Sequence, residues 1–400
     1  MSQLAIAARR VLAIDVFRGI TILTMVFVNE LAGVTNVPGW MKHLPADVDG
    51  MTFVDLVFPA FLFIVGMSIP FASAARLSKG ANLPGIFNHV LIRSVSLIVI
   101  GVFMVNSAAG FNQSAMALPI SVWTLLMYGA VLLIWCQYPK QASRLATTAP
   151  RLLGVALLIT LWALYRSSDG GGMSPQWWGI LGLIGWAYLL ASAVYLLALN
   201  ATSAVTHVAI LAGAAIAFIG LFFLLGATNS DSAILGFIIE NNRNHTHAAI
   251  VLAGTLLSTL FYNARLSALK LRSVAAFSIV SGLLALASWQ VSPISKIWAT
   301  PSWALFSIFF CGVIFSVTYW LVDVRGHTRW CQLFAPAAAN PLLAYILPSI
   351  LIAAVSLAGV SYRPAIFDTG LAGIVWSLAF AFVMMGITAL LTRAGVKLKL

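Results

Sequence analysis

The sequence predicts an all-α integral membrane protein, a polytopic bundle of about 11 to 12 transmembrane helices with its N- and C-termini in the cytoplasm. Of its 400 residues, 61% are hydrophobic and only 8% are Asp, Glu, Lys or Arg, whereas about 25% of the residues in soluble proteins are charged. Apolar runs of the length that a bilayer demands recur along the whole chain. So few charges could not cover a soluble domain, and we expect a single integral membrane domain over residues 1–400.

Each long apolar stretch is expected to form one span. The first stretch contains Asp15 and Arg18, and no small-residue cleavage site follows it, so it reads as a retained span and not as a signal peptide. The spans divide into N-terminal helices with the candidate catalytic motifs (11–106), middle spans (107–290) and C-terminal spans (291–400). The predicted spans are 11–32, 53–74, 89–106, 119–138, 151–166, 177–198, 207–226, 247–263, 273–290, 303–322, 332–358 and 369–391.

The positive charges support this layout. The chain carries 22 Lys and Arg residues against 10 acidic ones, a net charge of +12. With the N-terminus inside, 15 of the 22 lie in cytoplasmic ends and loops, five lie outside and two lie within spans. This bias follows the positive-inside rule, so the net charge indicates membrane orientation and not a nucleic-acid partner. None of the three cysteines has metal-ligand spacing, and no metal is expected.

The first span carries a stripe of polar residues. Asp15 and Arg18 are three residues apart, so they share a helix face and can pair. Asn29 follows Arg18 by 11 residues, which places it about 20° past three whole turns and about 16 Å higher on the same face. Such a stripe must face protein or a water-filled path. The alternative is a structural ion pair with an Asn at the helix end.

The outer loop after this span and the start of the next one contain the strongest candidates for chemistry. His43 lies close in sequence to Asp47 and Asp49, and a histidine beside a carboxylate is a candidate general base. The alternative is an ordinary solvated loop histidine. In the second span, Pro59 cannot donate to the carbonyl of Asp55, so a carboxylate and a freed carbonyl meet at one level. Capping by Thr52 with a plain kink is the alternative there.

Further polar residues lie in or beside later spans. Arg93 has the geometry to bind a phosphate bidentately, or to extend along the helix to the interface. Lys296, Asn340 and Tyr345 are additional candidates, and the Asn340–Pro341 pair is expected to break the eleventh span or to delay its start. His245 and His247 have only a weak metal-binding pattern.

Several of these segments together resemble the heparan-alpha-glucosaminide N-acetyltransferase family of transmembrane acyltransferases. The N-terminal part is AIDVFRGITILTMVFVNE (13–30), then Lys42-His43, then DGMTFVDLVFPAFLFIVGMSIP (49–70). The C-terminal part is KIWATPSW (296–303), YWLVDVRG (319–326) and AAANPLLAYIL (337–347). The middle of the chain carries no such resemblance.

The resemblance implies transfer of an acetyl group from cytoplasmic acetyl-CoA to an amine or hydroxyl of a sugar or glycan on the opposite side of the membrane. The family's catalytic histidine and asparagine fall on His43 and Asn29, and Asp49 and Asp55 are the expected carboxylates of the site. Asp15, Arg18 and Arg93 are expected to bind the CoA, and Lys42, Lys296, Asn340 and Tyr345 the acceptor. Membrane lipid and a second copy of the chain are the other expected partners, and a bacterial inner membrane is the expected location.

A secondary transporter is the competing hypothesis. Twelve spans with both ends inside is a common transporter layout, and Asp15 with Arg18 could form an intramembrane relay. Against this, the sequence shows no related halves and no paired broken helices. A non-catalytic membrane protein that binds lipid or glycan is a third possibility.

Overall fold

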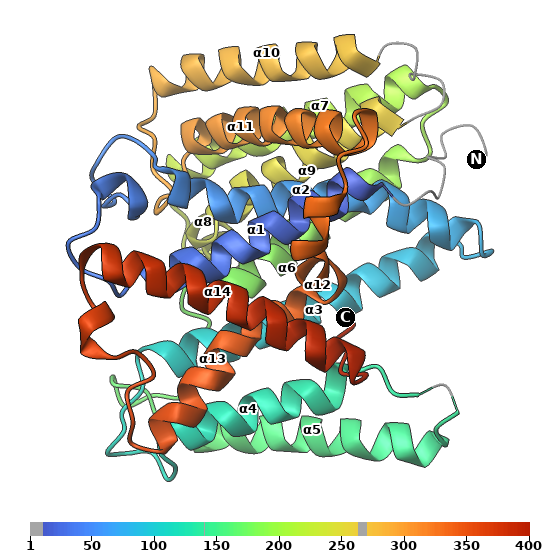
Figure 1. Ribbon diagram of the computed structural model, residues 1–400. Coiled ribbons are helices and arrows are strands. Elements are labelled where there is room, and N and C mark those ends of the chain that lie inside the picture. Colours follow the sequence, from blue (N-terminus) through green and yellow to red (C-terminus); the bar gives the residue numbers. More distant parts are fainter. Residues whose placement is uncertain (1–10, 140, 263–269) are drawn as a thin grey trace. The chain divides into compact units, whose positions relative to one another are not determined.

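The protein is helical throughout the part that its structure, a computed structural model, describes (Figure 1). That part comprises residues 11–139, 141–262 and 270–400. Within these ranges every regular element is a helix, and the only β-pairing is in isolated bridges such as Thr35 with Thr369. The predicted all-α fold is therefore confirmed.

Each predicted span corresponds to a helix. Nine of the described helices are long and apolar enough to cross a membrane, and α4 and α13 are shorter apolar helices. The chain is thus an integral membrane protein. The helices that match the spans are α1 (Leu12–Leu31), α2 (Phe53–Leu77), α3 (Leu83–Ala108), α4 (Ile120–Trp135), α5 (Arg144–Leu164), α6 (Gly179–Ala198), α7 (Ala204–Gly226), α9 (Arg243–Tyr262), α10 (Lys270–Trp289), α11 (Pro301–Tyr319), α13 (Pro341–Leu357) and α14 (Gly370–Arg393).

Two short helices interrupt this pattern. α8 (Ala233–Glu240) lies in a loop, and α12 (Ala335–Ala339) precedes α13 within the predicted span 332–358. Asn340 separates α12 from α13 with non-helical backbone angles, φ −140° and ψ 63°. Its successor Pro341 occupies the first position of α13, where a missing N–H leaves no helical bond unmade. The predicted break at Asn340–Pro341 is therefore confirmed.

Large apolar side chains project outward from several helices. On α5, Leu152 and Ile159 are exposed, and on α7 Ile216 and Leu224 are exposed. In water such surfaces would drive aggregation, whereas in a bilayer they face acyl chains. These helix faces therefore fit a lipid environment.

The described chain forms two compact units, each built from separated stretches of sequence. Among the described residues, unit 1 contains 11–21, 38–94, 184–262 and 270–330, and unit 2 contains 22–37, 95–139, 141–183 and 331–400. The first unit thus holds the loop with His43, α2, and the helices from α7 to α11. The second holds α4, α5, α13 and α14.

Unit 1 is organised around the crossing of α2 and α9. Gly66 of α2 lies against the backbone of Val251, and Gly254 of α9 lies against the backbone of Phe63. Because a glycine has no Cβ, the two helices approach closely enough for Thr255 Oγ1 to donate to the Gly66 carbonyl over 3.0 Å. Helix α11 packs against both helices and against α10, which runs beside it (Figure 1).

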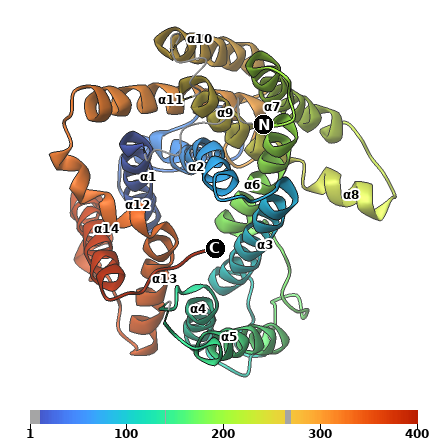
Figure 2. The same ribbon diagram turned by 90° about the vertical axis from the view of Figure 1, so that its right-hand side faces the viewer.

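Unit 2 contains the pair α4 and α5, which run side by side in both views (Figures 1 and 2), and α13, which packs on α4 and on α14. Trp123 of α4 is fully buried, and its indole Nε1 donates to the Leu161 carbonyl of α5 over 3.0 Å. A buried indole that finds a carbonyl partner fixes the register of the two helices.

Candidate active site at the start of helix α2

The clearest cluster of chemically active side chains lies where the loop after α1 leads into α2. His43 Nδ1 lies 2.6 Å from Asp55 Oδ1. The Asp55 side chain is 2% exposed and the His43 side chain is 38% exposed. A buried carboxylate therefore holds an accessible imidazole, and with the N–H on Nδ1 the lone pair of Nε2 is left to accept a proton.

Asp55 divides its carboxylate oxygens between two partners. Oδ1 binds His43, whereas Oδ2 accepts a hydrogen bond of 3.0 Å from the Thr52 backbone N–H. Thr52 Oγ1 accepts from Val54 N over 3.2 Å, which completes a capping box at the first turn of α2. The helix cap at Thr52, which the sequence analysis gave as the alternative to a catalytic role, is thus present. Asp55 takes part in this cap and also contacts His43.

The hydroxyl of Thr52 also ties the preceding loop to the helix. Thr52 Oγ1 donates to the Lys42 carbonyl over 2.8 Å. This bond fixes the backbone of the residue before His43. The start of α2 therefore positions both members of the histidine–carboxylate pair.

Pro59 frees the Asp55 carbonyl, and a tryptophan satisfies it. Trp303 Nε1 donates to that carbonyl over 3.2 Å, and Trp303 is fully buried in the first turn of α11. The prediction of a carbonyl without its helical donor is thereby confirmed, and α11 holds the backbone of α2 at the level of the carboxylate.

A second histidine packs beside this junction. The ring of His247, on α9, makes edge contacts with Phe58 and Trp303 at centroid distances of 5.3 Å and 6.0 Å. His247 is buried, and its Nδ1 has no hydrogen-bond partner in the ranges that the structure describes. The ring centroid of His245 instead lies 5.8 Å from that of Phe218. The two histidines therefore pack against different aromatic rings.

Lys296 approaches the other ring nitrogen of His43. Its Nζ lies 3.3 Å from His43 Nε2. Lys296 stands in the loop between α10 and α11, outside the spans, and burial lowers the pKa of its amine while the charge of Asp55 opposes that shift. The three side chains form a chain of polar contacts in the order Lys296, His43, Asp55.

Asp49 holds the loop that carries Lys296. Its carboxylate accepts from Trp289 Nε1 over 2.9 Å and from the Ile294 backbone N–H over 2.7 Å. The adjacent Gly50 N–H donates to the Ile294 carbonyl over 3.0 Å. Sequence expected Asp49 or Asp47 to orient His43, but the structure gives that position to Asp55, and Asp49 joins the two loops of the site.

The polar side chains in the first two turns of α1 are paired. Arg18 Nη1 lies 3.1 Å from Asp15 Oδ1, and Nη2 donates to Ser68 Oγ of α2 over 2.7 Å. The predicted pairing of Asp15 with Arg18 is confirmed, and Arg18 faces protein. Since its guanidinium already binds two partners, this arrangement fits the structural alternative better than phosphate binding.

Arg93 is in a different situation. Its guanidinium carbon lies 5.0 Å from the centroid of the Tyr188 ring, and its Nε is buried without a hydrogen-bond partner in the described chain. A guanidinium stacked on an aromatic ring keeps its edge free for an anion. Arg93 is therefore the better of the two arginines for a phosphate.

Asn29 lines a polar cavity in unit 2. This cavity has a volume of about 140 Å³, and Asn29 shares it with Glu30, Tyr345, Ser349 and Tyr362. The structure thus brings together two residues, Asn29 and Tyr345, that sequence predicted from distant segments. Because His43 belongs to unit 1, its association with Asn29 in one site stays a prediction.

Glu30 is the charged residue of this cavity that sequence reasoning missed. It is 6% exposed, and its carboxylate accepts from Trp376 Nε1 over 3.0 Å and from Tyr362 Oη over 3.3 Å. Arg363 Nη1 lies 3.4 Å from Oε1. The signal was a carboxylate at the end of an apolar span, directly after Asn29, where an unpaired charge would be costly.

Asn340 serves the fold of unit 2. Its Nδ2 donates to Thr392 Oγ1 over 3.0 Å and to the Val396 carbonyl over 2.8 Å, and its Oδ1 accepts from Leu398 N over 3.2 Å. These bonds attach the C-terminal segment to the break between α12 and α13. The sequence analysis assigned Asn340 to acceptor binding. In the structure its side chain instead makes these three hydrogen bonds within unit 2.

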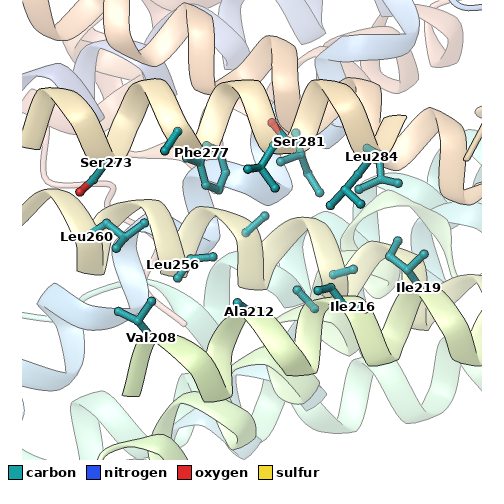
Figure 3. Close-up of a pocket in the computed structure, with 17 residues that line it drawn as sticks. Val208, Ala212, Ile216, Ile219, Leu256, Leu260, Ser273, Phe277, Ser281 and Leu284 are labelled. Atoms are coloured by element: carbon teal, nitrogen blue, oxygen red, sulfur yellow. The ribbon is translucent and has the colours of Figure 1, made fainter. Parts of the chain in front are cut away.

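Unit 1 also contains an apolar groove (Figure 3). It measures about 410 Å³ and is lined from α7, α9, α10 and α11, with Ile216, Leu256 and Phe277 among its walls. Its lining includes no ionisable side chain, and the hydroxyls of Ser273 and Ser281 are its polar groups. The groove therefore suits a hydrocarbon chain and not acid–base chemistry.

Fold and site together define a polytopic helical membrane protein with a buried carboxylate on an accessible histidine. Residues 10–229, more than half of the chain, match the family described as "Domain of unknown function (DUF5009)". The protein belongs to this family.

Part of the chain is also similar to two curated enzymes. It is 38% identical over 100 residues to the heparan-alpha-glucosaminide N-acetyltransferase of Mus musculus, and 39% identical over 97 residues to that of Homo sapiens. These stretches are 25% and 24% of this chain but only 14% of each relative. The likeness predicted from the motifs is confirmed, and it covers a small part of the relatives' length.

Proposed function

We propose that this protein is a transmembrane acetyltransferase that moves an acetyl group from acetyl-CoA to an amine or hydroxyl of a sugar, with His43 as the general base. The observation that carries the proposal is the contact of the buried Asp55 carboxylate with Nδ1 of the exposed His43. The partial likeness to two N-acetyltransferases supports the reaction type. Acetyl-CoA, the sugar and the location in a bacterial inner membrane belong to the proposal.

In the proposed step the acceptor nitrogen or oxygen attacks the thioester carbonyl carbon while His43 Nε2 takes its proton. The new bond forms and the carbon–sulfur bond breaks. The imidazolium returns its proton to the departing thiolate. Asp55 stabilises the imidazolium through Nδ1–H, which is the part that a buried carboxylate supplies in histidine-based acyl transfer.

The remaining roles follow from the family resemblance and from the contacts that each residue makes. We assign the amide of Asn29 to the developing oxyanion, since such a donor is worth about 100- to 1,000-fold in rate. Arg93 is assigned to the CoA phosphates because its Nε is unpartnered in the described residues. Lys42 and Lys296, beside His43, and Tyr345, in the cavity with Asn29, are assigned to the acceptor.

A relay through Asp15 and Arg18, as in a transporter, has less support. Arg18 binds Asp15 and Ser68 at 3.1 Å and 2.7 Å. A guanidinium does not release its proton at physiological pH. The pair is therefore a fixed structural contact and a poor proton carrier.

Reconstituted vesicles test the proposed function. Labelled acetyl-CoA supplied on the predicted cytoplasmic face should yield label on an amino sugar enclosed on the other side, at a rate well above that of protein-free vesicles. Uptake of unmodified solute without acyl-CoA, with no label transferred, would instead indicate a transporter. The label position on the sugar nitrogen or oxygen distinguishes N- from O-acylation.

Replacing Asp49 with alanine should lower the transfer rate about 10- to 100-fold without removing any group that touches the acceptor. The loss of its bonds to Trp289 and Ile294 releases the loop that carries Lys296, and small displacements of positioning groups have effects of this size. The matched control is Asp47→Ala in the same loop, for which we expect a rate within about twofold of wild type. Equal rates in the two variants would contradict the positioning role of Asp49.

A further inference from the structure

Lys296 stands where the nucleophile of an acyl transfer would stand. Its Nζ is 3.3 Å from His43 Nε2, and His43 Nδ1 is 2.6 Å from Asp55 Oδ1. Nucleophile, imidazole and carboxylate follow one another in this order in histidine-dependent acyl transfer. An acyl group placed for attack by an acceptor on Nε2 is therefore also within reach of the Lys296 amine.

The loop around Lys296 holds the amine in this position. Ser295 N donates to Thr300 Oγ1 over 3.0 Å, and Thr300 N donates to the Ser295 carbonyl over 3.1 Å. Ser302 Oγ donates to the Pro293 carbonyl over 2.7 Å, and Asp49 binds the Ile294 N–H. Because the backbone on both sides of Lys296 is fixed, its approach to His43 is part of the built site.

The burial of Lys296 favours its neutral, nucleophilic form. Burial lowers the pKa of the amine, with Asp55 of α2 as the opposing charge. His43 faces the amine from the outer loop, and His247 of α9 lies within electrostatic range. Arg243 of α9 adds a positive charge at the same loop, with its guanidinium carbon 4.6 Å from the centroid of the Trp298 ring. Burial therefore disfavours the ammonium form of Lys296, and the Asp55 carboxylate opposes that effect.

We propose that Lys296 is a self-acetylation site: when an acetyl thioester is bound and no acceptor is present, the Lys296 amine takes the acetyl group. The inference rests on the proposed function. Nζ bonds to the thioester carbonyl carbon while His43 Nε2 takes a proton from Nζ, the carbon–sulfur bond breaks, and the proton leaves with the thiolate. The products are an Nζ-acetyl amide and free thiol, so atoms and charge balance.

Acetylation of Lys296 closes the site to acceptors. The amide is neutral and non-nucleophilic, and it occupies the space beside His43 Nε2 that an acceptor amine or hydroxyl needs. An amide does not release its acetyl group under the conditions in which a thioester does. Turnover without acceptor therefore inactivates the protein, and a bound acceptor protects it.

The test is mass spectrometry on the full-length protein in lipid nanodiscs, incubated with acetyl-CoA and no acceptor. We expect one acetyl group on Lys296, formed at least tenfold faster than on Lys42, which directly precedes His43 in the chain, and faster than on the C-terminal Lys397. The same reaction in His43→Gln should be at least tenfold slower. Glucosamine in excess should suppress it.

A chemical probe gives a second measurement that does not depend on the proposed function. The lowered pKa means that the neutral amine of Lys296 persists to lower pH than that of an exposed lysine. Labelling of Lys296 by the N-hydroxysuccinimide ester of acetic acid should therefore reach half its maximal rate at a lower pH than labelling of Lys397. In the Lys296→Arg variant, checked for an unchanged melting temperature, the label on this peptide should be absent, which identifies Lys296 as the labelled residue.

The outcomes separate the two proposals. Transfer to glucosamine with Lys296 acetylated no faster than Lys42 would overturn self-acetylation and leave the proposed function intact. Acetylation of Lys296 without transfer to any sugar amine would support self-acetylation and count against the sugar acceptor. If neither reaction occurs and the probe labels Lys296 and Lys397 with the same pH midpoint, both are overturned.

Discussion

Replacement of His43 by alanine should reduce acetyl transfer by about 100- to 10,000-fold, the range that a positioned general base contributes. The His43 side chain is 38% exposed, so its removal leaves no large cavity and the protein should fold normally. Asp55→Asn should cause a comparable loss, since an amide neither carries the charge that stabilises the imidazolium nor selects the Nδ1–H tautomer. Initial rates of label transfer to an amino sugar, at saturating acetyl-CoA, measure both effects.

The control for this prediction is a histidine outside the cluster. His245 contacts Phe218 and not the Asp55 carboxylate, so His245→Gln should retain a rate within about twofold of wild type. A His43→Ala protein with a wild-type melting temperature and a wild-type transfer rate would remove His43 from the chemistry.

Placing a methyl group on Gly66 should destabilise the packing of α2 on α9 in unit 1. A Cβ at this position would lie 1.9 Å from the Val251 carbonyl oxygen of α9, which is backbone and cannot turn aside. The helices must then separate, with loss of the hydrogen bonds of 3.0 Å from Thr255 to the Gly66 carbonyl and from Ser258 to the Met67 carbonyl. Overpacking of this kind costs about 1 to 3 kcal/mol and sometimes more, so we expect Gly66→Ala to lower the melting temperature by roughly 5 °C or more.

The reciprocal glycine should behave in the same way, and a third glycine provides the control. A Cβ on Gly254 would lie 2.0 Å from the Phe63 carbonyl oxygen, whereas one on Gly213 of α7 would have no atom within 4 Å. Gly213→Ala should therefore be neutral or slightly stabilising, as alanine is the better helix former. Equal melting temperatures for the Gly66 and Gly213 variants in the same detergent would contradict close packing of α2 on α9.

The helices were predictable because a bilayer imposes one simple rule, a long apolar run for each span. The run from Phe53 to Leu77 and the break at Asn340 both follow from local composition and backbone chemistry. Helix α8 was not predicted, because an eight-residue apolar helix in a loop does not have the length of a span.

The site was predictable only where its contacts are local. The spacing of Asp15 and Arg18 and the donor missing at Pro59 act within one helix, and both appear as expected. The orienting carboxylate was sought in the same loop as His43, at Asp47 or Asp49, whereas Asp55 supplies it from 12 residues away. Nothing local indicates such a contact, since the path of the loop decides which acid reaches the imidazole.

Long-range contacts were beyond sequence reasoning. Lys296 reaches His43 across 253 positions of the chain, and Trp289 reaches Asp49 across 240. Glu30 escaped notice because its partner Arg363 lies in a loop more than 300 residues later. Each of these pairs depends on helix packing, which a single sequence does not specify residue by residue.

Our central claim is that His43 and Asp55 act as one unit in acyl transfer, and a double-mutant cycle tests it most directly. Transfer rates are measured for His43→Gln, Asp55→Asn and the double variant in nanodiscs, with folding verified by melting temperature. Groups that act together show strongly non-additive losses, so the double variant should be no slower than His43→Gln within about threefold. Losses that multiply across the two sites, or no loss in either single variant, would contradict the claim.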